Sequence, residues 1–503
     1  MLIKKYILAF LVTGTILAGC SKDFLDQQPT NAIPEQELYK TTGDIETVLN
    51  GTWAYMMDTY FTFANPGYSA ILRASDAMGS DVAILTSKYG YPASYQFTDL
   101  PDRTIRRPEY FWRLLYKVID NCNNVIAKVD QVTGDEAEKG YLKGQALALR
   151  AHCYLTLANF WQFNYRKDPN AKVVPVYTEP STSTTQGKAK STETELYTLI
   201  TTDLEAAVKL LQGYSRASAS KHKINANVAN GLLARAYLNM GNWQLAAEKA
   251  TAAAQSYSLM SGADYAKGFN DVQNVEWIWG HPQIPSQSVA SYSFHFLDVS
   301  SPASYYYSFM ADPYFKELFE ASDVRSNLFE WDTLPGREGL LRYKKFIFRP
   351  DMTGDIVLMR AAEMYLIEAE GYAEQGLLPE AAAALNKLRA ARNATPLVIT
   401  TQTKEEVVKE IWKERRKELW GEGFSLSDIL RTQQAVVRKA YTDAGGSPVR
   451  VSVPRGDGTF KTVTAKGHTS LKFPDGSAYV PNSPYYLFAI PIVESNNNPN
   501  LDK

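Results

Sequence analysis

Apolar side chains recur every three or four residues along much of this chain, which is the pattern of helices with one buried face. The run at 109–129 is the longest regular example. Ser191 or Thr192 can cap a further helix, because glutamates at positions 193 and 195 fall in its first turn. The pattern predicts helices over Asp44–Met57, Glu109–Val129, Ala137–Phe163, from about 192 to 211, and Lys404–Leu419. In the last of these, the spacing predicts a buried side made of Val408, Ile411, Trp412, Arg415 and Leu419 and ion pairs of Glu405 with Lys409, Glu410 with Lys413 and Glu414 with Lys417.

Two segments follow a helix–turn–helix scheme with small residues between the helices. Ala226–Met240 is followed by a Gly-Asn turn and a second helix at 243–257. Residues 358–392 repeat the scheme, and Gly376 interrupts the apolar pattern between the two helices. Such pairs resemble tetratricopeptide units, which bury their faces by stacking on one another. We therefore predict a mostly α fold in which tetratricopeptide-like helix pairs form a scaffold, with large irregular loop regions and short strands.

Two long regions lack this periodicity. Residues 59–107 and 261–351 mix Gly, Pro, Ser and Asp with many aromatic side chains. Long ordered loops commonly carry function. Within the second region, Val275–Trp279 is typical of a short strand. Trp277 and Trp279 fall on one face of it, so we expect both to be buried.

The N-terminus has the layout of a secretory signal. Lys4 and Lys5 precede an apolar run at 7–18, which is too short to span a bilayer, and Leu-Ala-Gly-Cys closes it at Cys20. This ending resembles the bacterial lipoprotein signal, in which the cysteine is diacylated and becomes the new N-terminus. We predict a signal peptide at 1–19, a lipidated tether at 20–36 and a single helical domain at 37–503.

Net charge argues against nucleic acid as a partner. The full chain carries a net charge of −1, and removal of residues 1–19 leaves 51 basic against 54 acidic residues. Binding to a phosphate backbone needs a basic surface, and this balance provides none. Beyond the signal, no apolar segment reaches the length of a membrane span.

Three cysteines are present, and Cys20 is reserved for lipid in this interpretation. Cys122 and Cys153 both lie in helical apolar patterns. A disulfide between them is possible in an oxidising compartment, but the patterns favour two buried free thiols.

Catalytic motifs are largely absent. The chain contains no phosphate-binding loop, no nucleophile elbow and no H-E-x-x-H zinc motif. The five histidines, at 152, 222, 281, 295 and 468, have no spacing that would gather a metal on one element. Glycoside hydrolysis needs two facing carboxylates, and no spacing among the 54 acidic residues marks such a pair. We expect no cofactor.

The aromatic loops are the best candidate for a binding site. Flat rings with polar edges beside Asp, Asn, Arg and Gln suit the recognition of sugars, although many such rings also fill seams between loops and helices. We predict that a ligand lies between the two irregular regions. The predicted contacts are Asp76, Tyr89, Tyr91 and Tyr95 from the first region and His281, Tyr292 and Tyr306 from the second.

Several segments, taken in order, resemble the SusD/RagB family of surface glycan-binding lipoproteins of Bacteroidetes. They are CSKDFLDQQP at 20–29, DIETVLNGTW at 44–53, GQALALRAHCY at 144–154, LARAYLNMGNW at 233–243, ERRKELWGEGFSLSDILR at 414–431 and IPIVESNNNP at 490–499. The fifth is the most specific family motif. Ser425 departs from it, because the family usually has Arg there, and the usual final Asn-Pro-Gly-Tyr is missing.

The resemblance implies a non-enzymatic protein on the cell surface. It would be anchored in the outer membrane by lipid on Cys20, bind oligosaccharide or polysaccharide, and deliver it to a SusC-like TonB-dependent transporter. Two alternatives stay open: a lipoprotein glycoside hydrolase, or a structural lid, scaffold or peptide-binding subunit of the transporter. Glycan ligands vary so widely in the family that the resemblance names none.

Overall fold

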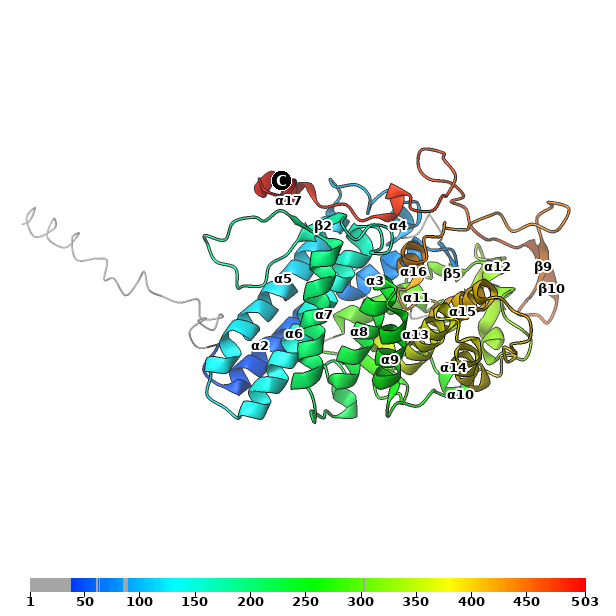
Figure 1. Cartoon of the computed structure of the whole chain (residues 1–503). Helices are drawn as coiled ribbons and strands as arrows, with labels where there is room; N and C mark the ends of the chain where they lie inside the picture. The colour runs from blue at the N-terminus through cyan, green and yellow to red at the C-terminus, as the bar shows by residue number, and fades with distance from the viewer. Residues whose placement is uncertain (1–37, 60–61, 63, 85–88, 287, 302–303) are drawn as a thin grey trace, which may run out of the picture.

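The computed structural model describes residues 38–59, 62, 64–84, 89–286, 288–301 and 304–503. The predicted signal peptide, Cys20 and the tether at 20–36 lie outside these residues. Long helices stand side by side over most of the molecule, and the longer loops gather at one end of them (Figure 1). The long helices are α2 (Thr42–Met56), α5 (Arg106–Lys128), α6 (Glu136–Trp161), α7 (Glu193–Leu210), α8 (Ala226–Met240), α9 (Trp243–Ala254), α13 (Ala361–Glu374), α14 (Leu378–Ala391) and α15 (Lys404–Leu419).

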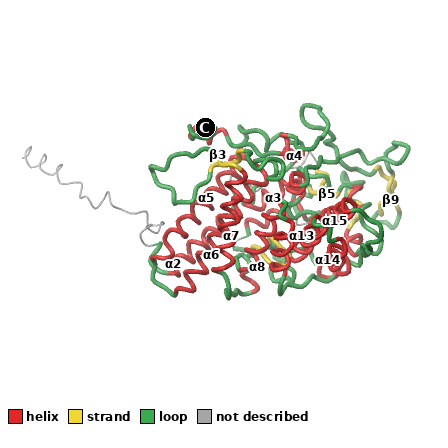
Figure 2. Tube along the Cα trace, in the orientation of Figure 1, coloured by secondary structure: helices red, strands yellow, loops and turns green. Residues whose placement is uncertain are grey.

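The remaining elements are short and lie mostly in the loop regions (Figure 2). The short helices are α3 (Tyr68–Ala77), α4 (Pro92–Tyr95), α10 (Gly262–Tyr265), α11 (Phe294–Leu297), α12 (Pro313–Lys316), α16 (Ser425–Arg431) and α17 (Ile492–Asn497). The strands are β1 (Val82–Ile84), β2 (Lys172–Pro175), β3 (Lys190–Thr192), β4 (Trp277–His281), β5 (Phe309–Ala311), β6 (Phe329–Trp331), β7 (Leu341–Tyr343), β8 (Ile356–Arg360), β9 (Arg450–Pro454) and β10 (Phe460–Thr464). The predicted class, mostly α with short strands, is confirmed.

Local sequence signals explain where several helices begin. Thr192 caps α7: its hydroxyl accepts from the backbone N–H of Glu195, and the Glu195 carboxylate accepts from the Thr192 N–H. Thr403 and Glu406 form the same reciprocal pair at the start of α15. Each such box satisfies two backbone donors that the first turn of a helix leaves free.

Both predicted helix pairs form. Gly241 ends α8 in the left-handed conformation, with φ of 74°, and α9 begins two residues later. Gly376, with φ of 80°, lies in the turn between α13 and α14. The pairs stack on each other where α9 meets α13: a Cβ on Gly371 would lie 2.7 Å from the Trp243 carbonyl oxygen. Small residues therefore set the close helix packing, as the sequence predicted.

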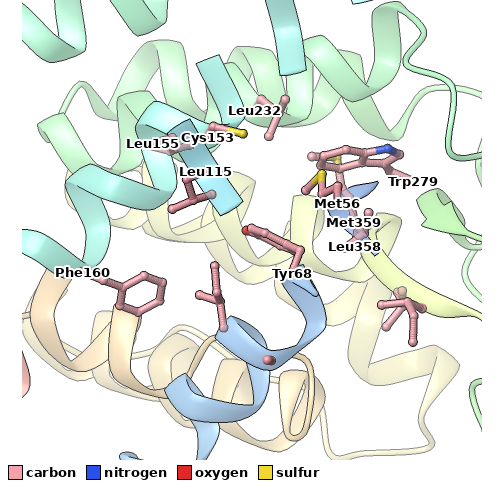
Figure 3. Packing of buried hydrophobic residues seen from close by; sticks show 14 of the residues in the cluster. Met56, Tyr68, Leu115, Cys153, Leu155, Phe160, Leu232, Trp279, Leu358 and Met359 are labelled. Carbon is pink, nitrogen blue, oxygen red and sulfur yellow. The ribbon is translucent and has the colours of Figure 1, made fainter. Parts of the chain in front are cut away.

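Side chains from distant segments share one hydrophobic core (Figure 3). Tyr68, Cys153 and Trp279 come from α3, α6 and β4 and point into the same interior. Trp277 and Trp279 are fully buried, which confirms that prediction. Their strand, β4, pairs antiparallel with β8. Cys122 and Cys153 are free, buried thiols, as the helical patterns favoured.

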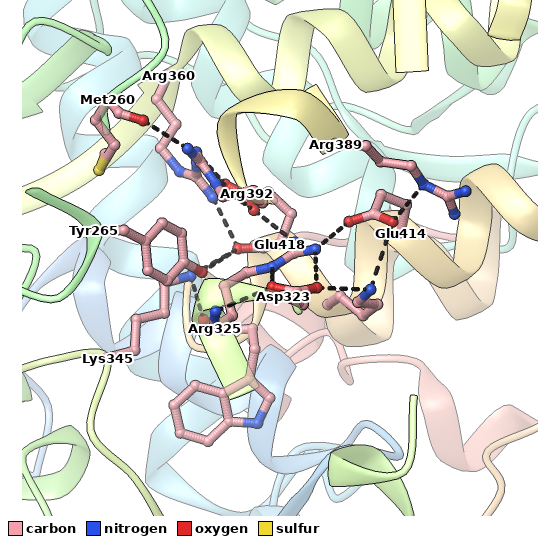
Figure 4. Close-up of polar contacts among 12 residues, drawn as sticks. Met260, Tyr265, Asp323, Arg325, Lys345, Arg360, Arg389, Arg392, Glu414 and Glu418 are labelled. Atoms are coloured by element: carbon pink, nitrogen blue, oxygen red, sulfur yellow. Dashed lines mark hydrogen bonds and ion pairs between the residues drawn. The ribbon is translucent and has the colours of Figure 1, made fainter. Parts of the chain in front are cut away.

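Part of the interior is filled by charged side chains that pair with one another (Figure 4). The carboxylate of Glu418 lies 2.8 Å from the guanidinium of Arg325, 2.5 Å from that of Arg360 and 2.8 Å from that of Arg392, and all four side chains are fully buried. The network continues through Glu276, Asp323, Lys345, Glu414, Lys417 and Glu422.

The amphipathic pattern of α15 predicted only part of this burial. It placed Val408, Ile411, Trp412, Arg415 and Leu419 on the buried side; Trp412 is half-buried and the other four are buried. The pair Glu414–Lys417 forms at 3.7 Å, but both side chains are fully buried rather than on a solvated face. Charged residues can occupy an interior only when partners compensate them, and here the partners come from elements that the local pattern of α15 does not reveal.

In the part of the chain that the structure describes, no helix combines the length and the apolar character that crossing a bilayer requires.

Candidate functional site

The two irregular regions meet in a small antiparallel sheet. Strand β1, from the first region, pairs antiparallel with β5, from the second, so that Val82 lies opposite Ala311 and Ile84 opposite Phe309. Strands β7 and β6 extend this sheet in the order β1-β5-β7-β6. Residues more than 200 positions apart in the sequence are thereby held on one rigid support.

Aromatic side chains from both regions gather beside this sheet. We call the five residues Tyr89, Tyr292, His295, Tyr305 and Tyr306 the aromatic platform. The ring of Tyr306 lies at its centre, with its centroid 5.1 Å from that of Tyr89 and 6.4 Å from that of Tyr292. Tyr305 is stacked on His295 at 4.3 Å. Tyr89 and Tyr305 are 45% and 62% exposed and face solvent, Tyr292 and Tyr306 are half-buried, and His295 is buried.

Buried rings hold the platform in place. Tyr306 stacks on Phe296 at 4.9 Å, and Phe296 meets the edge of Tyr91 at 5.1 Å. Gly90 is required for this approach, because a Cβ there would lie 2.4 Å from the Phe296 ring and its φ is 112°. The exposed rings therefore rest on a packed layer and are presented in a defined arrangement.

Burial keeps two of the platform side chains, His295 and Tyr306, uncharged near neutral pH. Burial lowers the pKa of His295 to about 4, so its imidazole is neutral, and the Tyr305 N–H donates to its Nδ1 at 3.3 Å. Burial raises the pKa of Tyr306 to about 12, so its phenol keeps its proton. A neutral aromatic surface offers dispersion contact and hydrogen bonds from hydroxyl edges, and it does not select for ligand charge.

Three of the predicted site residues, Tyr89, Tyr292 and Tyr306, come together in the platform. Asp76 does not: it is buried, one of its carboxylate oxygens (Oδ2) accepts from the Gly423 N–H at 2.9 Å, and burial raises its pKa to about 7. Helix α3 turns this side chain towards the motif at 414–431 rather than towards solvent, so its prediction as a ligand contact is wrong.

The prediction of Tyr91 and Tyr95 as ligand contacts is also wrong, because both side chains are fully buried. The Tyr91 hydroxyl donates to the Ala64 carbonyl at 2.8 Å, and its ring supports the platform from below. The Tyr95 hydroxyl bonds Nδ1 of His468 at 3.0 Å, and the guanidinium of Arg438 covers its ring. Each phenol thus has its polar edge satisfied inside the protein.

His281 makes its ring contact and its side-chain hydrogen bond with residues outside the platform. It ends strand β4, its Nδ1 bonds the side-chain amide of Gln283 at 2.9 Å, and its ring lies 5.9 Å from that of His222. Burial lowers its pKa to about 4. These two contacts, Gln283 and His222, are not platform residues, so the role of His281 as a ligand contact stays a prediction.

Two members of the platform, His295 and Tyr305, lie in the second irregular region but were not among the predicted ligand contacts. The run Tyr305-Tyr306-Tyr307 marked the position, but nothing in it indicated which rings face outward. Tyr307 turns inward under the Arg337 guanidinium, whereas Tyr305 is the most exposed of the three. Among the described residues, no cluster of His, Cys, Asp and Glu side chains is arranged to hold a metal ion.

Helix pairs that support an aromatic surface with exposed rings are typical of a binding protein. A family model described as "SusD family" matches residues 349–503, and one described as "Starch-binding associating with outer membrane" matches residues 23–238. A solved SusD-like carbohydrate-binding protein from Bacteroides vulgatus is 43% identical, with a TM-score of 0.86 over 92% of this chain and 98% of that one. The chain belongs to the SusD family.

Two curated relatives come from Formosa agariphila. SusD-like protein P2 is 28% identical over 250 residues, which are 49% of this chain and 45% of that protein. SusD-like protein P38 is 22% identical over 483 residues, covering 85% of this chain and 90% of that protein. The match thus spans less than half the length of P2 but nearly all of P38.

Proposed function

We propose that this protein binds oligosaccharide or polysaccharide on the aromatic platform and delivers it to a SusC-like TonB-dependent transporter in the outer membrane. The observation that carries the proposal is the cluster of Tyr89, Tyr292, Tyr305 and Tyr306 on a rigid support, in which Tyr89 and Tyr305 are exposed and the other two are half-buried. Sugar rings have apolar faces that stack on aromatic rings and hydroxyl groups that bond their polar edges. Membership of a family described as starch-binding and associated with the outer membrane supports the same interpretation.

Binding is proposed to occur without turnover. The platform presents aromatic rings rather than the two facing carboxylates that hydrolysis of a glycosidic bond needs. Asp76, the acidic residue predicted for this site, is buried and bonded to backbone.

Single alanine variants at Tyr89, Tyr292, Tyr305 and Tyr306 are expected to weaken glycan binding several-fold or more. A stacking ring contributes roughly 1–3 kcal/mol if sugars stack as nucleobases do. Binding would be found by screening the helical domain, residues 37–503, on a panel of neutral and acidic glycans, and its affinity would be measured by calorimetry. Tyr441→Ala is the matched control, because Tyr441 is partly exposed and pairs with Tyr314 outside the platform.

Unchanged affinity in all four platform variants for a glycan that the parent binds would place the binding site elsewhere. The same incubations can be assayed for new reducing ends. Product formation that survives repurification and persists in the platform variants would instead indicate a glycoside hydrolase.

Lipid attachment at Cys20 is a separate part of the proposal. The Cys20→Ala variant, expressed in a host that processes bacterial lipoproteins, is expected to leave the membrane fraction, because its N-terminus can no longer accept an acyl chain. Fractionation followed by immunoblotting measures this. Cys122→Ala is the control, since Cys122 is a buried thiol that lipid cannot reach. Retention of Cys20→Ala in the membrane at the parent level would contradict lipid anchoring through this residue.

A further inference from the structure

A second recess lies between α3, α15 and α16 and takes its lining from residues outside the platform. The pocket has a volume of about 310 Å³. Its apolar walls include Trp412, Leu419, Trp420, Phe424 and Ile429. A concave site of this size with aromatic walls is in the range that holds small molecules.

Cationic side chains border this pocket along one face of α15. Lys409, Lys413 and Arg416 lie four and three residues apart, so they project from the same side of the helix. Lys413 pairs with Glu410 at 2.7 Å and Arg416 with Asp81 at 2.6 Å. Lys409 is exposed and makes no ion pair within the described part of the chain, and the predicted pairing with Glu405 does not form there.

Arg415 adds a buried cation to the same lining. Its Nε donates to Asp428 at 2.7 Å, but its Nη1 is buried and has no hydrogen-bond partner among the described residues. A charged donor left unpartnered in an interior is costly, so an acceptor nearby would be favoured.

The acidic side chains that line the pocket already form ion pairs or hydrogen bonds within the protein. Asp81 pairs with Arg416, and Asp428 is shared by Arg415 and Arg431. Asp76 accepts from the Gly423 N–H and lies 3.7 Å from Arg73. The positive charge that stays available, on Lys409 and around Arg415, therefore decides the electrostatic preference of the pocket for a ligand.

We propose that this pocket binds a small amphipathic carboxylate, with its aromatic or aliphatic body between Trp412, Trp420 and Ile429 and its anionic end towards the cationic side of α15. The apolar walls provide burial of the ligand body. The lysine and arginine side chains provide charge-assisted contacts that a neutral ligand of the same shape lacks. This site is independent of glycan binding at the platform.

The test uses 2-naphthoate as the probe and 2-naphthamide, its neutral counterpart of similar shape, as the matched control. Isothermal titration calorimetry of the soluble domain at low ionic strength is expected to show binding of the acid, and binding of the amide weakened by about five-fold or more. Quenching of tryptophan fluorescence is a second readout, because Trp412 and Trp420 line the pocket.

Two variants separate the contribution of the cationic side chains to binding from that of the pocket's shape. Lys409→Gln combined with Lys413→Gln is expected to weaken naphthoate binding about five-fold while leaving amide binding unchanged. The matched surface control is Lys466→Gln with Lys472→Gln, whose side chains are exposed and lie outside the lining. Ile429→Trp, which fills the pocket, is expected to abolish binding of both probes.

Failure of the parent protein to bind naphthoate at about 5 mM would overturn the proposal. Equal affinity for acid and amide would also overturn it, because the cationic side would then play no part. Binding that survives Ile429→Trp would show that the probe lies elsewhere. Circular dichroism and glycan binding at the platform, both expected to be unchanged in these variants, exclude a general loss of folding.

Discussion

Replacing Glu418 by alanine is expected to lower the free energy of unfolding by about 3–5 kcal/mol. Its carboxylate is the common partner of Arg325, Arg360 and Arg392, and all of these side chains are fully buried. Burial alone would raise the pKa of Glu418, but the three guanidinium groups hold it well below its usual range. Alanine would leave three buried cations sharing fewer anions, which is among the most destabilising changes that a core can suffer.

Urea denaturation followed by circular dichroism measures this effect. Glu405→Ala is the control, because Glu405 is exposed on the same helix and its loss should change stability by less than about 0.5 kcal/mol. Glu418→Gln keeps the size and part of the hydrogen bonding and is expected to give an intermediate loss, measurable even if the alanine variant does not fold. Stability of both Glu418 variants within about 1 kcal/mol of the parent would show that the network compensates without this carboxylate.

Glu193→Gln is expected to stabilise the protein at pH 8 by about 2–4 kcal/mol and to leave it nearly unchanged at pH 5. Glu193 lies in the first turn of α7, fully buried, and neither of its carboxylate oxygens has a hydrogen-bond partner among the described residues. Burial raises its pKa from 4.5 to about 8. The folded state therefore holds a proton on Glu193 across a pH range in which the unfolded state has lost it.

The direction in which stability changes with pH follows from this proton uptake. The contribution of a group whose pKa rises on folding is fully present below its unfolded pKa, and it is lost as the pH rises through the folded value. Glutamine does not titrate, so the parent should lose stability between about pH 4.5 and pH 8 relative to the variant. Urea unfolding at both pH values measures the difference.

Glu195→Gln is the matched control for this experiment, because it lies in the same helical turn and has the opposite shift. Its hydrogen bonds from the Thr192 backbone and hydroxyl lower the pKa of Glu195. Its contribution to stability is therefore present above the unfolded pKa and is lost as the pH falls through the folded one. Parallel pH profiles for the parent and Glu193→Gln would contradict the assignment of the buried proton to Glu193.

For the platform, the sequence was informative about location and uninformative about orientation. It singled out two irregular regions as the source of a binding surface, and β1 and β5 do bring them together. It named Tyr89, Tyr292 and Tyr306, but also Asp76, Tyr91 and Tyr95, which are buried. A loop has no regular period, so neighbouring tyrosines such as Tyr89 and Tyr91 carry the same local signal although one faces water and the other packs under Phe296.

The buried ion pairs also show that local spacing in the sequence predicts a contact but not its burial. The spacing of Glu414 and Lys417 indicated an ion pair on α15, and that pair exists. Its burial depends on Asp323 and Arg325, which lie at the start of a short 3-10 helix about 90 residues earlier in the chain. A helical period reports which residues share a face, but it cannot report what covers that face.

The sequence by itself determined the features that depend on neighbours within one turn of the chain. These are the helices, the Thr192 cap, the glycine turns of the two helix pairs and the family motifs. Helix propensity, capping and the close packing of small residues all depend on residues a few positions apart, so the sequence alone reveals them. Only the tertiary structure decided which aromatic rings form the platform, which charges are buried and where the pocket beside α15 opens. Those outcomes depend on contacts between segments distant in the sequence, where burial and compensation are settled by the assembled fold rather than by any one segment.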